Sequence, residues 1–212
     1  MKKILAMLLA LVMVLSLAAC ASTQPAAEPA ASSDAPAESG KTYTVGVCQL
    51  VQHEALDAAT QGFVDALKEA LGDAVTIDVQ NASGDSVNCG TIVNGFVAKG
   101  VDLIMANATP ALTAAVSATA DIPILGTSIT AYGVALDIDD FSGTVGGNIS
   151  GTSDLADLQK QAQMILDWFP ETKTVGLLFC SAEPNSRYQI DELRKALEAQ
   201  GVTCEEFAFT DS

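Results

Sequence analysis

Residues 42–80 read TYTVGVCQLVQHEALDAATQGFVDALKEALGDAVTIDVQ. Within them, Thr44–Gln49 and Val75–Val79 are short, mostly apolar runs that predict two strands. The intervening residues, Ala55–Leu71, place apolar side chains at helical spacing: Leu56, Ala59, Phe63, Leu67 and Ala70. Two strands joined by a helix of this length predict a βαβ unit, and therefore a parallel sheet.

The alternation of strands and helices continues toward the C-terminus. A second helix is predicted over Ser86–Lys99, with Gly100 in the C-cap position, and a third begins at Pro110. Two further strands are predicted before residue 142, at 102–107 and 122–127. After a Gly- and Ser-rich stretch over 142–153 the pattern restarts, with helices predicted at 155–169 and 185–200 and strands at 174–180 and 203–209.

The restart resembles an internal duplication. Thr44-Val45-Gly46-Val47 opens the first unit and Thr174-Val175-Gly176-Leu177 opens the second. Two similar α/β units joined by a Gly-rich crossover predict a clamp of two lobes with a ligand site between them. Only two strands are predicted in the second unit before Ser212, so we expect the chain to be a fragment or to end early.

The first twenty residues predict export. Lys2 and Lys3 precede an apolar run that ends in Leu17-Ala18-Ala19-Cys20, the order of a secretory signal. This ending resembles the lipobox of bacterial lipoproteins, in which cleavage precedes a lipidated cysteine, here Cys20. The predicted organisation is a lipoprotein signal peptide (1–20), a flexible tether (21–41), a first α/β lobe (42–149), and a crossover with a partial second lobe (150–212).

Composition excludes several classes of function. The chain has 26 acidic and 10 basic residues, a net charge of −16, which argues against nucleic-acid binding. The single histidine, His53, and the four cysteines that follow Cys20 (Cys48, Cys89, Cys180 and Cys204), none of them in a C-x-x-C spacing, match no zinc site. We therefore expect no metal and no cofactor, and we expect the four thiols to be free and buried.

Five motifs, in order, resemble one known family. They are His-Glu-Ala-Leu-Asp at 53–57, Asn-Ala-Ser-Gly-Asp at 81–85, Ala-Thr-Pro-Ala at 108–111, Gly-Asn-Ile-Ser-Gly-Thr-Ser-Asp-Leu at 147–155, and Lys-Thr-Val-Gly-Leu-Leu at 173–178 with Glu-Pro-Asn-Ser at 183–186. The chain resembles the tryptophan/tyrosine-type substrate-binding lipoproteins of ABC importers over essentially all of 42–212.

The resemblance implies a fold and a function. The implied fold is α/β and periplasmic-binding-protein-like, with two doubly wound parallel-sheet lobes, the second incomplete. The implied function is that of an extracytoplasmic protein, lipid-anchored to the cell membrane, that delivers a small molecule to an ABC permease without catalysis. The ligand implied is an amino acid, with aromatic ones among the candidates. One departure is that Ala131-Tyr132 follows Thr130 where the family commonly has Asp-Pro, so an acidic residue is lost and an aromatic one gained.

Candidate ligand-binding residues follow from the fold. Parallel α/β sheets bind ligands beyond the carboxyl ends of their strands, where helix N-termini offer backbone N–H groups to a carboxylate. Short polar side chains in these loops are equally suited to cap the helices. The residues predicted to bind ligand are Gln49, His53, Glu54, Asp85, Asn107, Thr109, Thr127, Ser128, Ser181, Glu183, Asn185 and Ser186.

Two other functions compete with transport. Cys48 and Cys180 end corresponding strands, as the two thiols of a cofactor-independent amino-acid racemase would. A ligand-sensing partner of a membrane receptor would have the same cleft as a transport protein. Among the aromatic side chains, Tyr132 is placed either on an aromatic ligand or in a packed loop, and Trp168 and Phe169 are predicted to lie in the core.

Overall fold

The computed structural model describes residues 40–210. The predicted signal, Cys20 and almost all of the predicted tether therefore lie outside the described residues. The first lobe runs through β1 (Tyr43–Gln49), α2 (Glu54–Leu71), β2 (Val75–Asn81), α3 (Ser86–Lys99), β3 (Leu103–Asn107), α4 (Thr109–Ala118), β4 (Ile124–Ile129), the short α5 (Tyr132–Ala135) and β5 (Ile149–Ser153).

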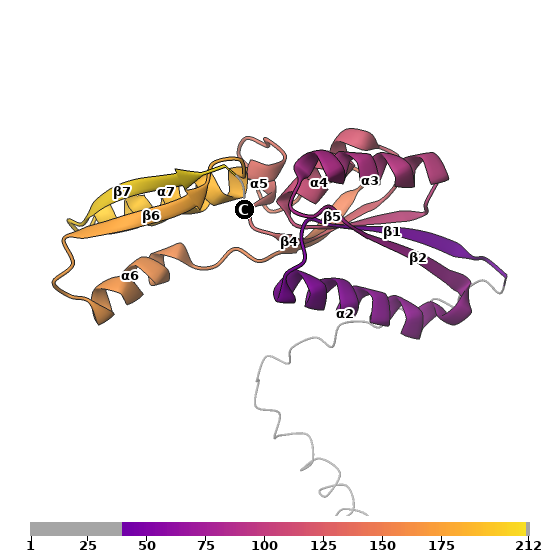
Figure 1. The fold of residues 1–212 in the computed structure, drawn as a ribbon, viewed down its shortest axis with the longest axis horizontal. Coiled ribbons are helices and arrows are strands. Elements are labelled where there is room, and N and C mark those ends of the chain that lie inside the picture. Colours follow the sequence, from indigo (N-terminus) through magenta and orange to yellow (C-terminus); the bar gives the residue numbers. More distant parts are fainter. Residues whose placement is uncertain (1–39, 211–212) are drawn as a thin grey trace, which may run out of the picture. The chain divides into compact units, whose positions relative to one another are not determined.

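A parallel sheet forms the centre of the first lobe. Its strand order is β2-β1-β3-β4-β5, and every neighbouring pair is parallel. Helix α2 lies on one side of the sheet, and α3 and α4 lie on the other (Figure 1). Val45 and Val47 pack with Met105 on the α2 side, whereas Ile104 and Ile124 belong to the larger cluster on the α3 and α4 side. The predicted doubly wound fold is confirmed for this lobe.

The helix ends are set by local signals in the sequence. Gly100 has φ 65° and ψ 46°, and its N–H reaches the carbonyls of Phe96 and Val97, which ends α3. At the other end of α3, the side chain of Asp85 accepts a hydrogen bond from the N–H of Val87. His53 caps α2 in the same way, because its Nδ1 accepts from the N–H of Ala55.

The second lobe contains α6 (Leu158–Trp168), β6 (Thr174–Cys180), α7 (Pro184–Glu198) and β7 (Thr203–Phe209). Strands β6 and β7 pair in parallel and have the predicted bounds. Leu177 and Phe179 of β6 pack against Ile190 and Leu197 of α7 and Ala162 of α6. A two-stranded parallel sheet with helices is what the sequence predicts for the described part of this lobe.

The structure adds a strand that periodicity did not predict. Residues 149–153 lie in the Gly- and Ser-rich stretch expected to be a crossover, yet they form β5 at the edge of the first sheet. Gly151, with φ 152°, passes so close to Gly126 that an added Cβ would lie 2.1 Å from the Gly126 carbonyl oxygen. The first lobe therefore extends to Ser153, four residues beyond the predicted boundary at 149.

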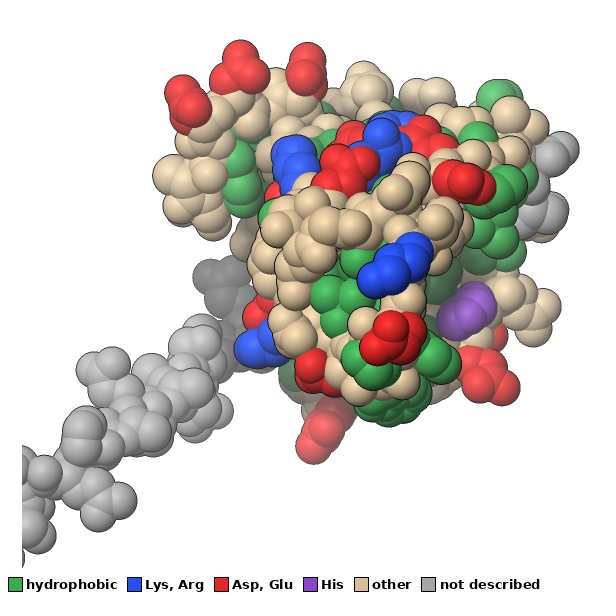
Figure 2. All heavy atoms as spheres, turned by 90° about the vertical axis from the view of Figure 1, so that its left-hand side faces the viewer, with side chains coloured by type: hydrophobic (Ala, Val, Ile, Leu, Met, Phe, Trp, Pro, Cys, Tyr) green, Lys and Arg blue, Asp and Glu red, His purple; other side chains and the backbone are tan. Residues whose placement is uncertain are grey.

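The surface of the second lobe holds several aromatic side chains. Trp168 is 73% exposed and Phe169 is 62% exposed, so the prediction that they lie in the core is wrong. Both residues follow Ile165 and Leu166, the last apolar residues of α6 that pack against the core. Helix α6 ends at Trp168, and Phe169 is its C-cap residue. Figure 2 shows apolar side chains at the surface on this side of the molecule, among charged ones.

None of the helices within residues 40–210 combines the length and the apolar character needed to cross a bilayer.

Candidate functional site

The carboxyl edge of the first sheet has the geometry of a binding site. Strands β1 and β3 are neighbours, but the chain leaves β1 for α2 on one side and leaves β3 for α4 on the other. The two loops diverge where Gln49 pairs with Asn107, which opens a crevice at the switch point of the sheet. The position agrees with the loops predicted from the sequence.

Gln49 and Asn107 themselves belong to a buried hydrogen-bond network. The hydroxyl of Thr60 donates to Gln49 Oε1 at 2.6 Å and accepts from Asn107 Nδ2 at 2.9 Å. Asn107 Nδ2 also donates to the carbonyl of Leu56, and Gln49 Nε2 donates to Asp57. These contacts hold α2 against the ends of β1 and β3. Gln49 and Asn107, two of the predicted binding residues, therefore use their side chains to hold α2 in place beside the crevice.

A hollow of about 740 Å³ opens beside this network. Its lining includes Gln49, Asp57 and Thr60 together with Asn81 and Ser83 of the loop after β2. Asn81 Oδ1 accepts from the N–H of Ser83, which holds that loop in a turn in which Ser83 has φ 57°. Asp57, Thr60, Asn81 and Ser83 were not singled out individually. The spacing of Asp57 and Thr60 places both on one face of the helix that follows β1, and this spacing could have indicated them as lining residues from the sequence.

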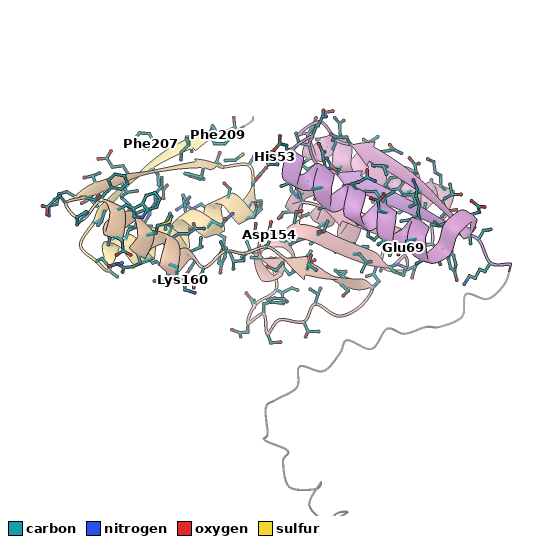
Figure 3. The ribbon with its side chains drawn as sticks, turned by 90° about the horizontal axis from the view of Figure 1, so that it is seen from below. His53, Glu69, Asp154, Lys160, Phe207 and Phe209 are labelled. Carbon is teal, nitrogen blue, oxygen red and sulfur yellow. The ribbon has the colours of Figure 1, made fainter. Side chains whose placement is uncertain are left out.

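Three predicted residues act at helix starts. His53 and Asp85 are side-chain caps, of α2 and α3 respectively, and Glu54 is exposed in the first turn of α2. Figure 3 shows His53 at the start of α2, with Glu69 toward the opposite end of the helix. The capping alternative thus accounts for His53 and Asp85, and the dipole of α2 favours Glu54 where it stands.

The start of α4 differs from those of α2 and α3. Its N-cap residue is Ala108, which provides no side-chain hydrogen bond, and Pro110 follows Thr109 in the first turn. The hydroxyl oxygen of Thr109 is buried and has no hydrogen-bond partner. Helix α4 therefore presents an uncapped N-terminus with an unsatisfied polar group beside it, which suits an anion.

The backbone at Ala108 is strained. Its φ of 90° and ψ of 157° lie in a region that only glycine adopts freely, at the exit of β3 toward α4. The N–H of Ala108 donates to the carbonyl of Thr127 at 3.0 Å, so the strained residue is tied to the neighbouring strand. Strain of this kind is concentrated at functional sites, and here it directs the chain into an uncapped helix.

Replacement of Ala108 by glycine should relieve this strain. We expect Ala108→Gly to raise the free energy of unfolding by about 1 kcal/mol, because the strain removed exceeds the added backbone entropy. Urea denaturation followed by circular dichroism would measure the change. Ala114→Gly in the middle of α4 is the matched control, and it should lower stability by about 1 kcal/mol. A loss of stability in both variants would contradict the assignment of strain to Ala108.

Thr127 and Ser128 are the remaining candidates in the first lobe. Both are half-buried at the end of β4, and Ser128 has φ 56°. The register between β4 and β5 shifts between Gly126 and Ile129, which places the irregularity at the carboxyl edge. The structure thus brings Thr127 close to Ala108 and Thr109, through the hydrogen bond between Ala108 and Thr127.

The candidates of the second lobe gather at the end of β6 and the start of α7. Ser186 Oγ accepts from the N–H of Cys180 at 3.1 Å, and Ser181 Oγ donates to the carbonyl of Phe209. Glu183 is the N-cap residue of α7 but makes no cap hydrogen bond with its side chain. Asn185 has a buried side-chain oxygen without a hydrogen-bond partner. Helix α7 therefore repeats the features of α4: a proline in the first turn, no side-chain cap and an unsatisfied buried oxygen.

One hollow of about 620 Å³ brings residues of both lobes together. It includes three of the predicted residues, Asp85, Glu183 and Ser186, and also Pro110 in the first turn of α4. An adjacent hollow of about 390 Å³ is lined by Thr109 and Pro110 together with Pro184. The starts of α4 and α7 thus border the same space.

The structure does not support the two-thiol arrangement of a racemase. Cys48 is fully buried among apolar residues on the α3 side of the sheet, and Cys180 is half-buried. The prediction of four buried thiols is wrong for Cys180 and Cys204, since both are half-buried. No group of three metal-ligating side chains lies together within residues 40–210.

Tyr132 is packed at the start of the short α5, in the segment that follows β4. It is 7% exposed, and its hydroxyl donates to the carbonyl of Gly126 at 3.1 Å. Burial raises the pKa of its phenol. The second of the two alternatives for Tyr132 is therefore confirmed, and the residue supports the close approach of β4 and β5.

Residues 44–212 match the family described as ABC transporter substrate binding protein. The chain belongs to this family. It is 36% identical over 199 residues to a tyrosine-binding protein of Clostridioides difficile (strain R20291), a match that covers 91% of this chain and 56% of that protein. The predicted family is thereby confirmed, and substrate-binding proteins of this kind are not enzymes.

Solved structures of the substrate-binding family have the same fold. An ABC domain from Streptococcus pneumoniae in complex with L-Trp is 37% identical, with a TM-score of 0.74 over 80% of this chain and 58% of that one. A conserved domain protein from Vibrio cholerae is 31% identical, with a TM-score of 0.74 and the same coverage. The periplasmic-binding-protein-like fold is thus confirmed. The chain spans a little over half the length of these relatives.

Proposed function

We propose that the protein is the extracytoplasmic substrate-binding component of an ABC importer, that it binds an amino acid between its two lobes, and that it passes this ligand to a membrane permease. Family membership supports the role. The relative named for tyrosine and the structure in complex with L-Trp make an aromatic amino acid the first candidate. Attachment to the membrane through a lipid on Cys20 would keep the protein beside its permease.

The observation that carries the proposal is the pair of uncapped helix starts. The first turns of α4 and α7 each lack a side-chain cap, and each holds a buried polar oxygen without a partner, in Thr109 and Asn185 respectively. Free N–H groups and the helix dipole make such ends favourable for a carboxylate. A ligand carboxylate would accept hydrogen bonds from the Thr109 hydroxyl and from the first backbone N–H groups of α4.

The ammonium group of the same ligand requires a negative partner. Glu183 lines the hollow of about 620 Å³ that includes residues of both lobes, and its carboxylate is not used to cap α7. Asp85 also lines this hollow, but its carboxylate is occupied by the N–H of Val87. Glu183 is therefore the better partner for the ammonium, and the two charged groups of an amino acid would be fixed by residues from both lobes.

The proposal is tested by comparing L-tryptophan and L-tyrosine with tryptamine and tyramine, which lack only the carboxylate. We expect the amino acids at about 5 mM to raise the melting temperature of the chain by mass action, and the amines to raise it little. Isothermal titration should show at least a tenfold difference in Kd, because a charged hydrogen-bonded group is worth about 1.5–3 kcal/mol. Equal binding of amine and amino acid would overturn the carboxylate assignment.

A matched pair of variants locates the carboxylate. Thr109→Val removes the hydroxyl at nearly constant volume and should weaken L-tryptophan binding about tenfold. Thr113→Val, one turn along α4, removes a hydroxyl that donates to the carbonyl of Thr109, and it should leave Kd within about twofold. If amino acids bind but Thr109→Val has no effect, the substrate-binding role stands and the assignment to α4 fails.

A further inference from the structure

Among the described residues, two of the four free cysteines belong to one buried cluster beneath the candidate site. Cys48 is the penultimate residue of β1, and Cys89 lies in the first turns of α3; both are fully buried in one apolar cluster. Cys48 faces the α3 side of the sheet, since its neighbour Val47 packs on the α2 side. Neither thiol has a role in the proposed binding of an amino acid.

The packing of α3 on β1 explains why the two side chains meet. Cys89, Val93 and Phe96 form the buried face of α3. The ring of Phe96 covers Gly46, because an added Cβ at Gly46 would lie 2.5 Å from Phe96 Cγ. Cys89 lies two turns before Phe96 along the helix, and Cys48 lies two residues after Gly46 along the strand. Since α3 runs back along the sheet, both steps lead to the same place, at the carboxyl edge.

We propose that Cys48 and Cys89 form an oxidisable pair that closes to a disulfide and fixes the start of α3 to the end of β1. The linked region includes the loop from Ala82 to Asp85, part of which lines the candidate site. The pair is therefore a modification site whose redox state sets the rigidity of that edge.

The pKa direction of Cys89 and its place near the exposed start of α3 favour Cys89 as the attacking sulfur. A hydrogen bond from Cys48 lowers the pKa of Cys89, while burial and the carboxylate of Asp85 oppose this change. The same hydrogen bond, together with burial, raises the pKa of Cys48. Thiolates and not thiols are the nucleophiles in this chemistry. The neighbouring residues Ser86, Val87 and Asn88 are exposed, so opening of the first turn of α3 gives an oxidant access.

Hydrogen peroxide is a sufficient oxidant. The Cys89 thiolate attacks one peroxide oxygen, the O–O bond breaks, and the departing hydroxide takes a proton to become water. The resulting sulfenic acid is then attacked by the sulfur of Cys48, which forms the S–S bond and breaks the S–O bond. The hydroxide released combines with the Cys48 proton as a second water. Two thiols are oxidised by two electrons in total, and one peroxide is reduced to two waters.

The other two cysteines provide an internal control. Cys204 pairs with Val175 at the start of β6, whereas Cys180 ends that strand, so the two thiols lie five residues apart along the sheet. At about 3.3 Å per residue this separation exceeds what a disulfide spans. The double variant Cys180→Ser, Cys204→Ser therefore retains only the proposed pair among the described residues.

The experiment treats this double variant of the full chain, with Cys20 also replaced by serine, with a small excess of hydrogen peroxide. We expect a loss of 2 Da and, after proteolysis without reduction, one peptide pair that joins Cys48 to Cys89. The crosslink closes a long loop and should raise the melting temperature by about 5–10 °C, reversibly with dithiothreitol.

Adding Cys89→Ala to the same background should abolish both the mass loss and the shift in melting temperature. If that variant does not fold, the peptide map of the pair-retaining variant decides alone. Oxidation that yields only sulfinic acid, or only linked dimers, would overturn the proposal.

Discussion

Replacement of Gly151 by alanine is expected to lower the free energy of unfolding by about 2–4 kcal/mol. An alanine Cβ would lie 2.1 Å from the Gly126 carbonyl oxygen and 2.1 Å from the hydroxyl of Tyr132. The backbone of Gly151 also has φ 152°, which alanine adopts only with strain. Because the obstructing atom is in the backbone of β4, rotation of a side chain cannot relieve the clash. Chemical denaturation would measure the loss.

Gly62→Ala is the matched control for this prediction. Gly62 is an exposed residue of α2, and an added Cβ meets nothing within 4 Å. The same chemical change should there raise stability by about 0.5–1 kcal/mol, because alanine is the better helix former. Similar behaviour of the two variants would show that β5 does not pass as close to Gly126 as the structure places it.

Thr60→Val is expected to cost about 2–4 kcal/mol, because it removes one hydroxyl that serves two buried partners. Gln49 Oε1 loses its donor at 2.6 Å, and Asn107 Nδ2 loses the side-chain acceptor of its two acceptors, at 2.9 Å, and keeps the carbonyl of Leu56. Valine has nearly the volume of threonine, so the loss reports hydrogen bonding and not a cavity. Denaturation curves would give the change in stability, and amide exchange should quicken at the start of α2.

Thr91→Val controls for the change of side chain itself. Thr91 is an exposed residue of α3 whose hydroxyl donates only to the carbonyl of Val87, within its own helix. We expect its replacement to change stability by less than about 0.5 kcal/mol. A comparable loss in the two variants would mean that the buried network does not anchor α2.

Much of the first lobe could be predicted from the sequence because its strands and helices are marked locally. The apolar period over Ala55–Leu71, Gly100 at the end of α3 and Pro110 at the start of α4 each act within a few residues. Strand β5 could not be predicted in this way. Ile149–Ser153 has little apolar character, and it is a strand only because β4 lies beside it.

The candidate site also has one part that is set locally in the sequence and another that is set by tertiary contacts. The loops that hold it follow from strand order and helix starts, and the twelve predicted residues lie in or beside them. Which of their side chains remain free is decided by partners far away in the sequence. The amide nitrogen of Asn107 reaches Leu56 and Thr60, 51 and 47 residues away, and so is occupied inside the lobe, whereas the Asn107 side-chain oxygen is buried without a partner. Thr109, two residues later, is buried without a partner.

The sequence by itself determined the alternation of elements, the repeat of an α/β unit and the family resemblance, because periodicity, caps and short motifs are local properties of the chain. Tertiary structure alone decided the addition of β5 to the first sheet, the burial of Tyr132, the exposure of Trp168 and the burial of Cys48 and Cys89 in one cluster. Each of these depends on which surface a distant segment covers, and that is settled only when the elements pack.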